Sequence, residues 1–127
     1  MKKTLKPISK SELHVMEVLW TDSPLAATDV NAAIEAKMGW NIKTTKTLLS
    51  RLVEKNILTT TRDGRRFLYQ PILSKEDYAA RSMTQLSEQL FDGSPLPIVL
   101  HLARTNSLSK KDREQIAQYL EALENED

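Results

Sequence analysis

The stretch from Trp40 to Lys55 reads WNIKTTKTLLSRLVEK. At 100° per residue, this stretch separates into two helical faces. One face is aliphatic and suits a protein core, whereas the other is cationic and carries hydroxyl groups, as a helix that enters a DNA major groove requires. An ordinary amphipathic surface helix is the alternative. The aliphatic face holds Thr45, Leu48, Leu49 and Leu52, and the polar face and its flanks hold Lys43, Thr44, Lys46, Thr47, Ser50, Arg51 and Glu54.

The residues after this stretch favour the DNA-binding interpretation. Thr59–Thr61 and Phe67–Tyr69 are β-formers. The Asp63-Gly64 pair between them predicts a hairpin with a type I′ turn, which needs positive φ at both central residues. Pro71 cannot donate a ladder hydrogen bond and marks the end of the second strand. Three arginines surround the hairpin tip: Arg62, Arg65 and Arg66. A basic helix followed by a basic-tipped hairpin predicts a winged helix-turn-helix.

Two further helices are predicted before the basic helix. Ser9 and Glu12 form a capping box at the start of the first. The second runs roughly over residues 27–38 and stops at Gly39, after which Asn41 caps the basic helix. The expected apolar side chains are Leu13, Met16, Leu19 and Trp20 in the first helix, and Val30, Ala33, Ile34 and Met38 in the second. We interpret Trp20 and Trp40 as core residues, and Lys37 and Lys55 as ordinary surface charges.

Residues after Pro71 predict a helical appendage that lacks a core of its own. Ser74-x-x-Asp77 and Ser109-x-x-Asp112 cap the first and last of three short helices, and residues 92–95 form a break. These helices would expose apolar area in a monomer, and pairing with a second copy would remove it from water at ~25 cal/mol per Å². Folding back onto the winged helix is the alternative. The residues predicted to form the dimer contact are Leu86, Leu90, Phe91, Val99, Leu102, Ile116 and Leu120.

The predicted fold class is therefore mostly α with a small β-hairpin wing. A winged helix-turn-helix domain is expected at residues 1–72 and a C-terminal helical dimerisation domain at residues 73–127. The residues predicted to contact DNA are Asn41, Lys43, Thr44, Lys46, Thr47, Ser50 and Arg51 of the basic helix, and Arg62, Arg65 and Arg66 of the wing.

The charge distribution agrees with this division. The whole chain carries a formal net charge of only +1. Residues 1–70 hold 12 Lys/Arg against 7 Asp/Glu, a net charge of +5, and the remainder holds 6 against 10, a net charge of −4. Within residues 37–66 the count is 8 against 2, or +6. Positive charge is thus concentrated on the helix and wing that are expected to meet phosphate.

Other function classes have less support in the sequence. An enzyme is not expected, because there is no Gly-rich phosphate loop, no nucleophile with a partnered base and no metal cluster. His14 and His101 lie far apart in sequence without other ligands, so we expect no metal site. No pocket-forming set of residues, thiol or His cluster indicates a cofactor or a small-molecule ligand. No signal segment or membrane span is evident, and a cytoplasmic protein is expected. A winged helix that serves only as a protein-interaction module remains the alternative function.

Short motifs follow one another in a specific order along nearly the whole chain: Ile8-Ser9, Glu12-Leu13, Val15-Met16, Trp20, Gly39-Trp40, Lys43-Thr44, Lys46-Thr47-Leu48, Arg51-Leu52, Asp63-Gly64, Phe91-Asp92-Gly93, Val99-Leu100 and Leu108-Ser109. In this order they resemble the penicillinase-repressor family (BlaI/MecI type). The resemblance implies a homodimeric transcriptional repressor with an N-terminal winged helix that binds DNA and a C-terminal helical domain that dimerises. It also implies palindromic operators built on TACA and TGTA half-sites, in front of β-lactamase or related stress genes.

The resemblance further implies a mode of release from DNA. A membrane metalloprotease receptor cleaves the best-studied members within the dimerisation domain, at an Asn-Phe bond. Here His101-Leu102 occupies that place, in the expected helix from Leu96 to Arg104, and so departs from the usual pair. The chain has no cysteine, so the thiolate copper sensing of some relatives is excluded.

Overall fold

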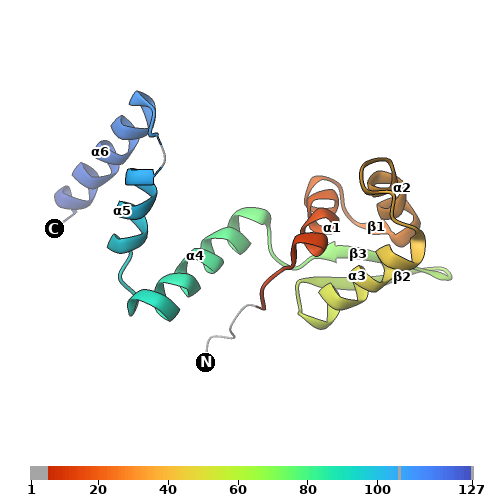
Figure 1. Cartoon of the computed structure of the whole chain (residues 1–127). Helices are drawn as coiled ribbons and strands as arrows, with labels where there is room; N and C mark the ends of the chain where they lie inside the picture. The colour runs from red at the N-terminus through yellow and green to blue at the C-terminus, as the bar shows by residue number, and fades with distance from the viewer. Residues whose placement is uncertain (1–5, 106, 127) are drawn as a thin grey trace. The chain divides into compact units, whose positions relative to one another are not determined.

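The structure is a computed structural model, which describes residues 6–105 and 107–126. Its helices and strands are labelled in Figure 1. By packing, the chain divides into two compact units, a first unit that ends at Gln85 and a second that begins at Leu86. The elements are α1 (Lys10–Thr21), β1 (Leu25–Ala26), α2 (Ala27–Met38), α3 (Ile42–Glu54), β2 (Leu58–Asp63), β3 (Arg66–Pro71), α4 (Lys75–Phe91), α5 (Leu96–Thr105) and α6 (Lys110–Asn125).

The capping box predicted for α1 is confirmed. The backbone N–H of Glu12 donates to Ser9 Oγ at 3.1 Å, and the N–H of Ser9 donates to Glu12 Oε1 at 2.8 Å. Of the predicted apolar face of α1, Met16 and Leu19 are buried and Trp20 is half-buried, but Leu13 is 41% exposed, and Val15, which was not predicted, is fully buried. The buried face is centred on Glu12 itself, which is only 1% exposed.

The ends of α2 and α3 follow the predicted signals. Gly39 ends α2 in the left-handed region at φ 67°. The side-chain oxygen of Asn41 accepts from the N–H of Thr44 at 3.0 Å and caps α3. Asn56 after α3 also has a positive φ, of 60°, which allows the chain to turn directly into β2.

Fewer apolar side chains of α2 are buried than predicted. Val30 and Ile34 are buried as predicted, but Ala33 and Met38 are exposed. The polar side chain of Asn31 is buried instead. The helix therefore places an amide group at the edge of the core, where it can contact the following turn.

The three strands form an antiparallel sheet in the order β1-β3-β2. Asp63 is paired with Arg66, so the central residues of the turn are Gly64 and Arg65. Only Gly64 of these two has a positive φ, which is the sign pattern of a type II′ turn. The predicted type I′ turn centred on Asp63-Gly64 was therefore wrong by one residue. β3 ends at Pro71 as predicted, whereas the pairing of β1 with β3 was not foreseen.

The core of the first unit lies between α1, α2, α3 and the start of the wing. Figure 1 shows α1, α2 and α3 gathered beside the sheet. The half-buried Trp20 and Trp40 pack against this core, as predicted. Its buried side chains are Val15, Met16, Leu19, Val30, Ile34, Leu48, Leu49, Leu52, Ile57 and Leu58.

The beginning of α4 belongs to the first unit. Trp20 Nε1 donates to the carbonyl of Leu73 at 3.0 Å, and the Trp20 and Tyr78 rings lie 6.0 Å apart between centroids. Lys75 Nζ lies 3.0 Å from a carboxylate oxygen of Glu17. Packing thus continues past residue 72, and the predicted functional boundary at 72/73 stays a prediction.

The second unit consists of the end of α4 with α5 and α6. Ser109 and Asp112 form the capping box of α6, as the sequence indicated. Ser87 is buried, and its hydroxyl donates to the carbonyl of Ser94 at 2.9 Å across the α4–α5 turn. Among the described residues from Leu86 onward, no apolar side chain is buried. None of the described helices combines the length and apolar character needed to cross a membrane.

Candidate nucleic-acid interface

The start of α3 is held in place by a buried amide. Asn31 Nδ2 donates to the carbonyl of Trp40 at 3.1 Å and to Thr45 Oγ1 at 2.8 Å. Both side chains in the second bond are buried. The amide joins α2, the intervening turn and α3, so it fixes the direction in which α3 leaves the turn. Sequence reasoning missed Asn31, for which the available signal was its place beside Val30 and Ile34 on the helical wheel.

The two-faced pattern predicted for α3 is confirmed. The inner residues Thr45, Leu48, Leu49 and Leu52 are all buried. The predicted DNA contacts on this helix and its cap are all exposed: Asn41, Lys43, Thr44, Lys46, Thr47, Ser50 and Arg51.

Two of the predicted contacts are already engaged within the helix. The side-chain oxygen of Asn41 is occupied by the capping bond, which leaves its NH₂ group for other partners. The Thr47 hydroxyl donates to the carbonyl of Lys43 at 3.0 Å, so its methyl group and its oxygen lone pairs remain available.

The cations on α3 differ from other lysines of the first unit in whether they are paired with a carboxylate. Within the part of the chain that the structure describes, Lys43, Lys46 and Arg51 form no ion pair with a carboxylate. Lys55 and Lys75, in contrast, are each paired with a glutamate. Unpaired cations on an exposed helix face leave a positive surface available to an anionic partner.

The three arginines of the wing have different surroundings, although all are exposed. Arg62 Cζ lies 5.3 Å from the ring centre of Phe67, its cross-strand neighbour. Arg66 donates to Asp63 Oδ2 at 3.1 Å from Nη2 and 3.2 Å from Nε. Arg65 occupies the second central position of the turn. The turn thus places Arg65 at the hairpin tip, while Arg66 shares its charge with Asp63.

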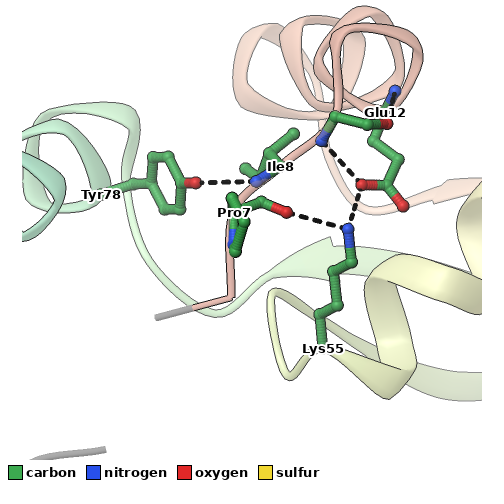
Figure 2. Close-up of polar contacts among 6 residues, drawn as sticks. Pro7, Ile8, Glu12, Lys55 and Tyr78 are labelled. Atoms are coloured by element: carbon green, nitrogen blue, oxygen red, sulfur yellow. Dashed lines mark hydrogen bonds and ion pairs between the residues drawn. The ribbon is translucent and has the colours of Figure 1, made fainter. Parts of the chain in front are cut away.

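Lys55, at the other end of α3, was predicted to be an ordinary surface charge, and this was wrong. Figure 2 shows its ammonium group between Glu12 and the carbonyl of Pro7. Lys55 Nζ forms an ion pair with Glu12 Oε1 and donates to the Pro7 oxygen at 2.9 Å. The Glu12 side chain is 2% exposed. The C-terminal end of α3 is therefore anchored to the beginning of α1.

The environment of Glu12 determines its charge state. Burial raises the pKa of its carboxyl group, because desolvation disfavours the charged form. The hydrogen bonds from Lys55 and from the backbone N–H of Ser9, together with the positive charge of Lys55, outweigh burial and lower the pKa below its ordinary value. Glu12 is thus an ionised carboxylate within the first unit at neutral pH.

The segment before α1 also forms a hydrogen bond with α4. The backbone N–H of Ile8 donates to the Tyr78 hydroxyl oxygen at 3.2 Å, as Figure 2 shows. Pro7 and Ile8 therefore contact both the end of α3 and the first turns of α4.

The predicted dimerisation residues lie on α4, α5 and α6. Phe91 is half-buried, and the others are at least 43% exposed. The predicted cleavage pair His101-Leu102 lies within α5, where both residues are exposed. Among the described residues, no group of three His, Cys, Asp or Glu side chains could hold a metal ion.

A sequence profile of the family described as "Penicillinase repressor" matches residues 8–122. The chain is 29% identical to the penicillinase repressor of Bacillus licheniformis over 97% of this chain and 96% of that protein. It is 24% identical to the methicillin resistance regulatory protein MecI of Mammaliicoccus sciuri, over 89% of this chain and 92% of that protein.

Two solved structures of BlaI resemble part of this chain. The DNA-binding domain of the repressor BlaI is 35% identical to the matched part, with a TM-score of 0.54, and the match covers 61% of this chain and 94% of that one. The monomeric form of Bacillus licheniformis BlaI in complex with the blaP half-operator gives a TM-score of 0.52 at 35% identity and the same coverage. The predicted winged-helix fold is confirmed by these likenesses.

Proposed function

The chain belongs to the penicillinase repressor family, and on this premise we propose that it is a transcriptional repressor that binds double-stranded DNA through α3 and the wing. One observation supports the proposal above the others. The exposed face of α3 carries three cations without a carboxylate partner among the described residues, while its opposite face is fixed in the core. The monomeric form of Bacillus licheniformis BlaI, which resembles 61% of this chain, has been solved in complex with the blaP half-operator.

We propose that α3 enters the major groove with its N-terminal half toward the bases. Lys43, Lys46 and Thr47 lie in this half, where helix-turn-helix proteins contact base edges. Lysine can donate to guanine O6 and N7, and a threonine methyl group can contact the methyl group of thymine. Arg51 and the wing arginines would then meet phosphates, which position the domain without reading much sequence.

We further propose that the protein acts as a homodimer on a palindrome of TACA and TGTA half-sites. The exposed apolar side chains of the second unit support this assembly, because no described apolar side chain there is buried within the single chain. Contact with a second copy would cover them. Two first units would then present α3 to half-sites about one helical turn apart, ~34–36 Å.

Release from DNA is proposed to follow cleavage in α5. A cut at or near His101-Leu102 would separate α6 from the rest of the chain, weaken the dimer and remove the contribution of the second half-site. A membrane metalloprotease receptor is the proposed agent, and β-lactamase or related stress genes are the proposed targets. During induction, immunoblots should show loss of the intact chain and a fragment that ends near His101. Complete derepression with the chain intact would contradict this route.

The test of DNA binding is a fluorescence-anisotropy titration of the full chain at several salt concentrations. The probes are a duplex that carries the TACA/TGTA palindrome and a scrambled duplex of equal length. We expect tighter binding to the palindrome and a steep fall of affinity with salt, because bound phosphates release counterions. A winged helix that serves only protein contacts would bind neither duplex, or would bind both weakly and equally.

A further inference from the structure

An open hollow of about 580 Å³ lies beside the predicted recognition helix, between the beginning of α1 and the side of α3 that runs from Lys43 to Arg51 in its last turn. It is distinct from the wing, and the beginning of α1 contributes two serines to it, the N-cap Ser9 and Ser11 in the first turn. Its lining combines cations, hydroxyl groups and apolar surface: Ser9, Ser11, Trp40, Lys43, Thr44, Thr47, Leu48 and Arg51.

The charged groups of the hollow are suited to an anion. Lys43 and Arg51 line it, and neither forms an ion pair within the described part of the chain. No carboxylate residue is among the lining residues. Arginine in particular can donate two parallel hydrogen bonds to a phosphate group. Lys43 and Arg51 therefore share one recess, and neither is neutralised by a carboxylate of the described residues.

The hydroxyl groups add donors to the same recess. Ser9 Oγ accepts the capping bond from Glu12, so its proton remains free to point outward. Ser11 and Thr44 are exposed residues on the two helices that border the hollow. Short hydroxyl side chains are frequent donors to phosphate oxygens in protein–DNA complexes.

The apolar part of the lining is held firmly. Trp40 is fixed through its backbone by Asn31, and its ring meets that of His14 edge-on at 5.8 Å. Leu48 belongs to the buried core. An apolar surface flanked by cations and hydroxyls matches a nucleic-acid strand, whose apolar sugar carbons alternate with charged phosphates.

We propose that this hollow binds the sugar–phosphate backbone of one DNA strand, with a phosphate held between Ser11 of α1 and Arg51 of α3. The proposal rests on the proposed function and adds α1 to the elements that contact DNA. Lys43 and Thr44 supply further charge and a hydroxyl group at the same place. Contacts of this kind fix the register of α3 on the duplex without reading sequence.

The decisive substitution is Ser11→Asp, with Thr21→Asp as its matched control. Both change one exposed hydroxyl residue of α1 into a carboxylate, at opposite ends of the helix. An acidic residue in the first turn of a helix stabilises the helix, so Ser11→Asp should not unfold the protein. Thermal unfolding followed by circular dichroism tests whether both variants are folded.

The experiment uses the full chain and palindromic duplexes that each carry one uncharged methylphosphonate, moved stepwise along a half-site. For the unchanged protein, one position should weaken binding because a contacted charge is lost. Ser11→Asp should weaken binding to the unmodified duplex by roughly tenfold through like-charge repulsion, whereas Thr21→Asp should change it little. At that one position the methylphosphonate should strengthen binding by Ser11→Asp, because it removes the repulsion between the new carboxylate and the phosphate. Its effect on affinity thus has the opposite sign from that in the unchanged protein.

For Arg51→Ala, the methylphosphonate at the same position should no longer weaken binding. The slope of log affinity against log salt concentration (the salt slope) should become shallower by about 1. The inference would be overturned if the Ser11→Asp and Thr21→Asp variants bound with equal affinity. It would also be overturned if no methylphosphonate position strengthened binding by Ser11→Asp. In both cases, palindrome binding by the unchanged protein would still uphold the proposed function. If the unchanged protein does not distinguish the palindrome from scrambled DNA, the proposed function fails and this inference fails with it.

Discussion

At the scale of single residues, Glu12 shows how a charge is stabilised inside the first unit. Its carboxylate accepts from Lys55 and from the N–H of Ser9 and is nearly excluded from water. Removal of one member of a buried ion pair leaves the other charge uncompensated, which costs more than the loss of a surface pair. Substitution of either residue should therefore destabilise the first unit, although the pair lies away from the proposed DNA contacts.

We predict that Glu12→Gln lowers the free energy of unfolding by ~1–3 kcal/mol, because Lys55 loses its counter-charge but can still reach water. Glu17→Gln is the matched control, since Glu17 pairs with Lys75 on the surface and should contribute only ~0–1 kcal/mol. Urea unfolding of both variants at neutral pH measures the difference. Equal losses would contradict the structural role of Glu12.

The same carboxylate predicts a dependence of stability on pH. The pKa of Glu12 is lowered on folding, so its contribution is present above the pKa of the unfolded chain, ~4.3. The contribution disappears as the pH falls through the lower pKa of the folded state. In unfolding titrations below about pH 4.3, the unchanged protein should approach the stability of Glu12→Gln. A constant difference down to the acid limit would show that Glu12 does not titrate in this way.

Base readout is the other prediction at this scale. Lys46→Ala or Thr47→Ala should each cost ~1–3 kcal/mol on the palindromic duplex and little on scrambled DNA. Anisotropy titrations on both duplexes measure the ratio of affinities. Equal losses on the two duplexes would mean that these residues contact phosphate.

Side chains whose role depends on distant partners were the least predictable. The face of α1 was misjudged because a charged Glu12 occupies its centre, and only contact with Lys55 makes burial there favourable. The role of Asn31 depends on Trp40 and Thr45, which the following turn brings to it. The exposed positions of α3, in contrast, were predicted correctly, because helical periodicity is a local property.

At the scale of elements, the ends of helices and strands follow local chemistry. The capping boxes at Ser9 and Ser109, the left-handed Gly39 and the strand end at Pro71 each depend on a few neighbouring residues, and each was predicted. β1 was missed because two residues give no periodic signal and its formation depends on pairing with β3. The turn of the wing moved by one residue because the register of the whole strand pair determines its centre.

The wing gives a prediction in which the two neighbouring arginines differ. Arg65→Ala should weaken binding to all DNA sequences and reduce the salt slope by about 1. Arg66→Ala should have a smaller effect, because Arg66 shares its charge with Asp63. Asp63→Asn is the control and should strengthen binding slightly, since it frees Arg66 and removes a negative charge. Normal affinity and an unchanged slope in both arginine variants would show that the wing does not touch DNA.

At the scale of the whole molecule, the first unit extends beyond the predicted boundary. The sequence suggested a division at residue 72 because Pro71 ends the wing and Ser74 begins a helix. Packing through Leu73, Lys75 and Tyr78 continues the first unit to Gln85. Such contacts join residues up to 70 positions apart, and no local pattern announces them.

We therefore predict that a fragment of residues 1–85 is more stable to heat than a fragment of residues 1–72. The shorter fragment loses the partners of Trp20, Glu17 and Ile8. Both fragments should sediment as monomers and bind the palindrome weakly and without cooperativity, whereas the full chain should be a dimer. A fragment that still dimerises with full affinity would contradict the role proposed for the second unit.

The exposed leucines of the second unit have a consequence for temperature. If their burial holds two copies together, the association is driven by the release of water and should weaken on cooling. The dimer should therefore dissociate at a higher protein concentration near 5 °C than near 30 °C. Sedimentation at the two temperatures measures this shift. In a cooled cell, operator sites would lose the repressor because its two halves separate, although each α3 remains intact.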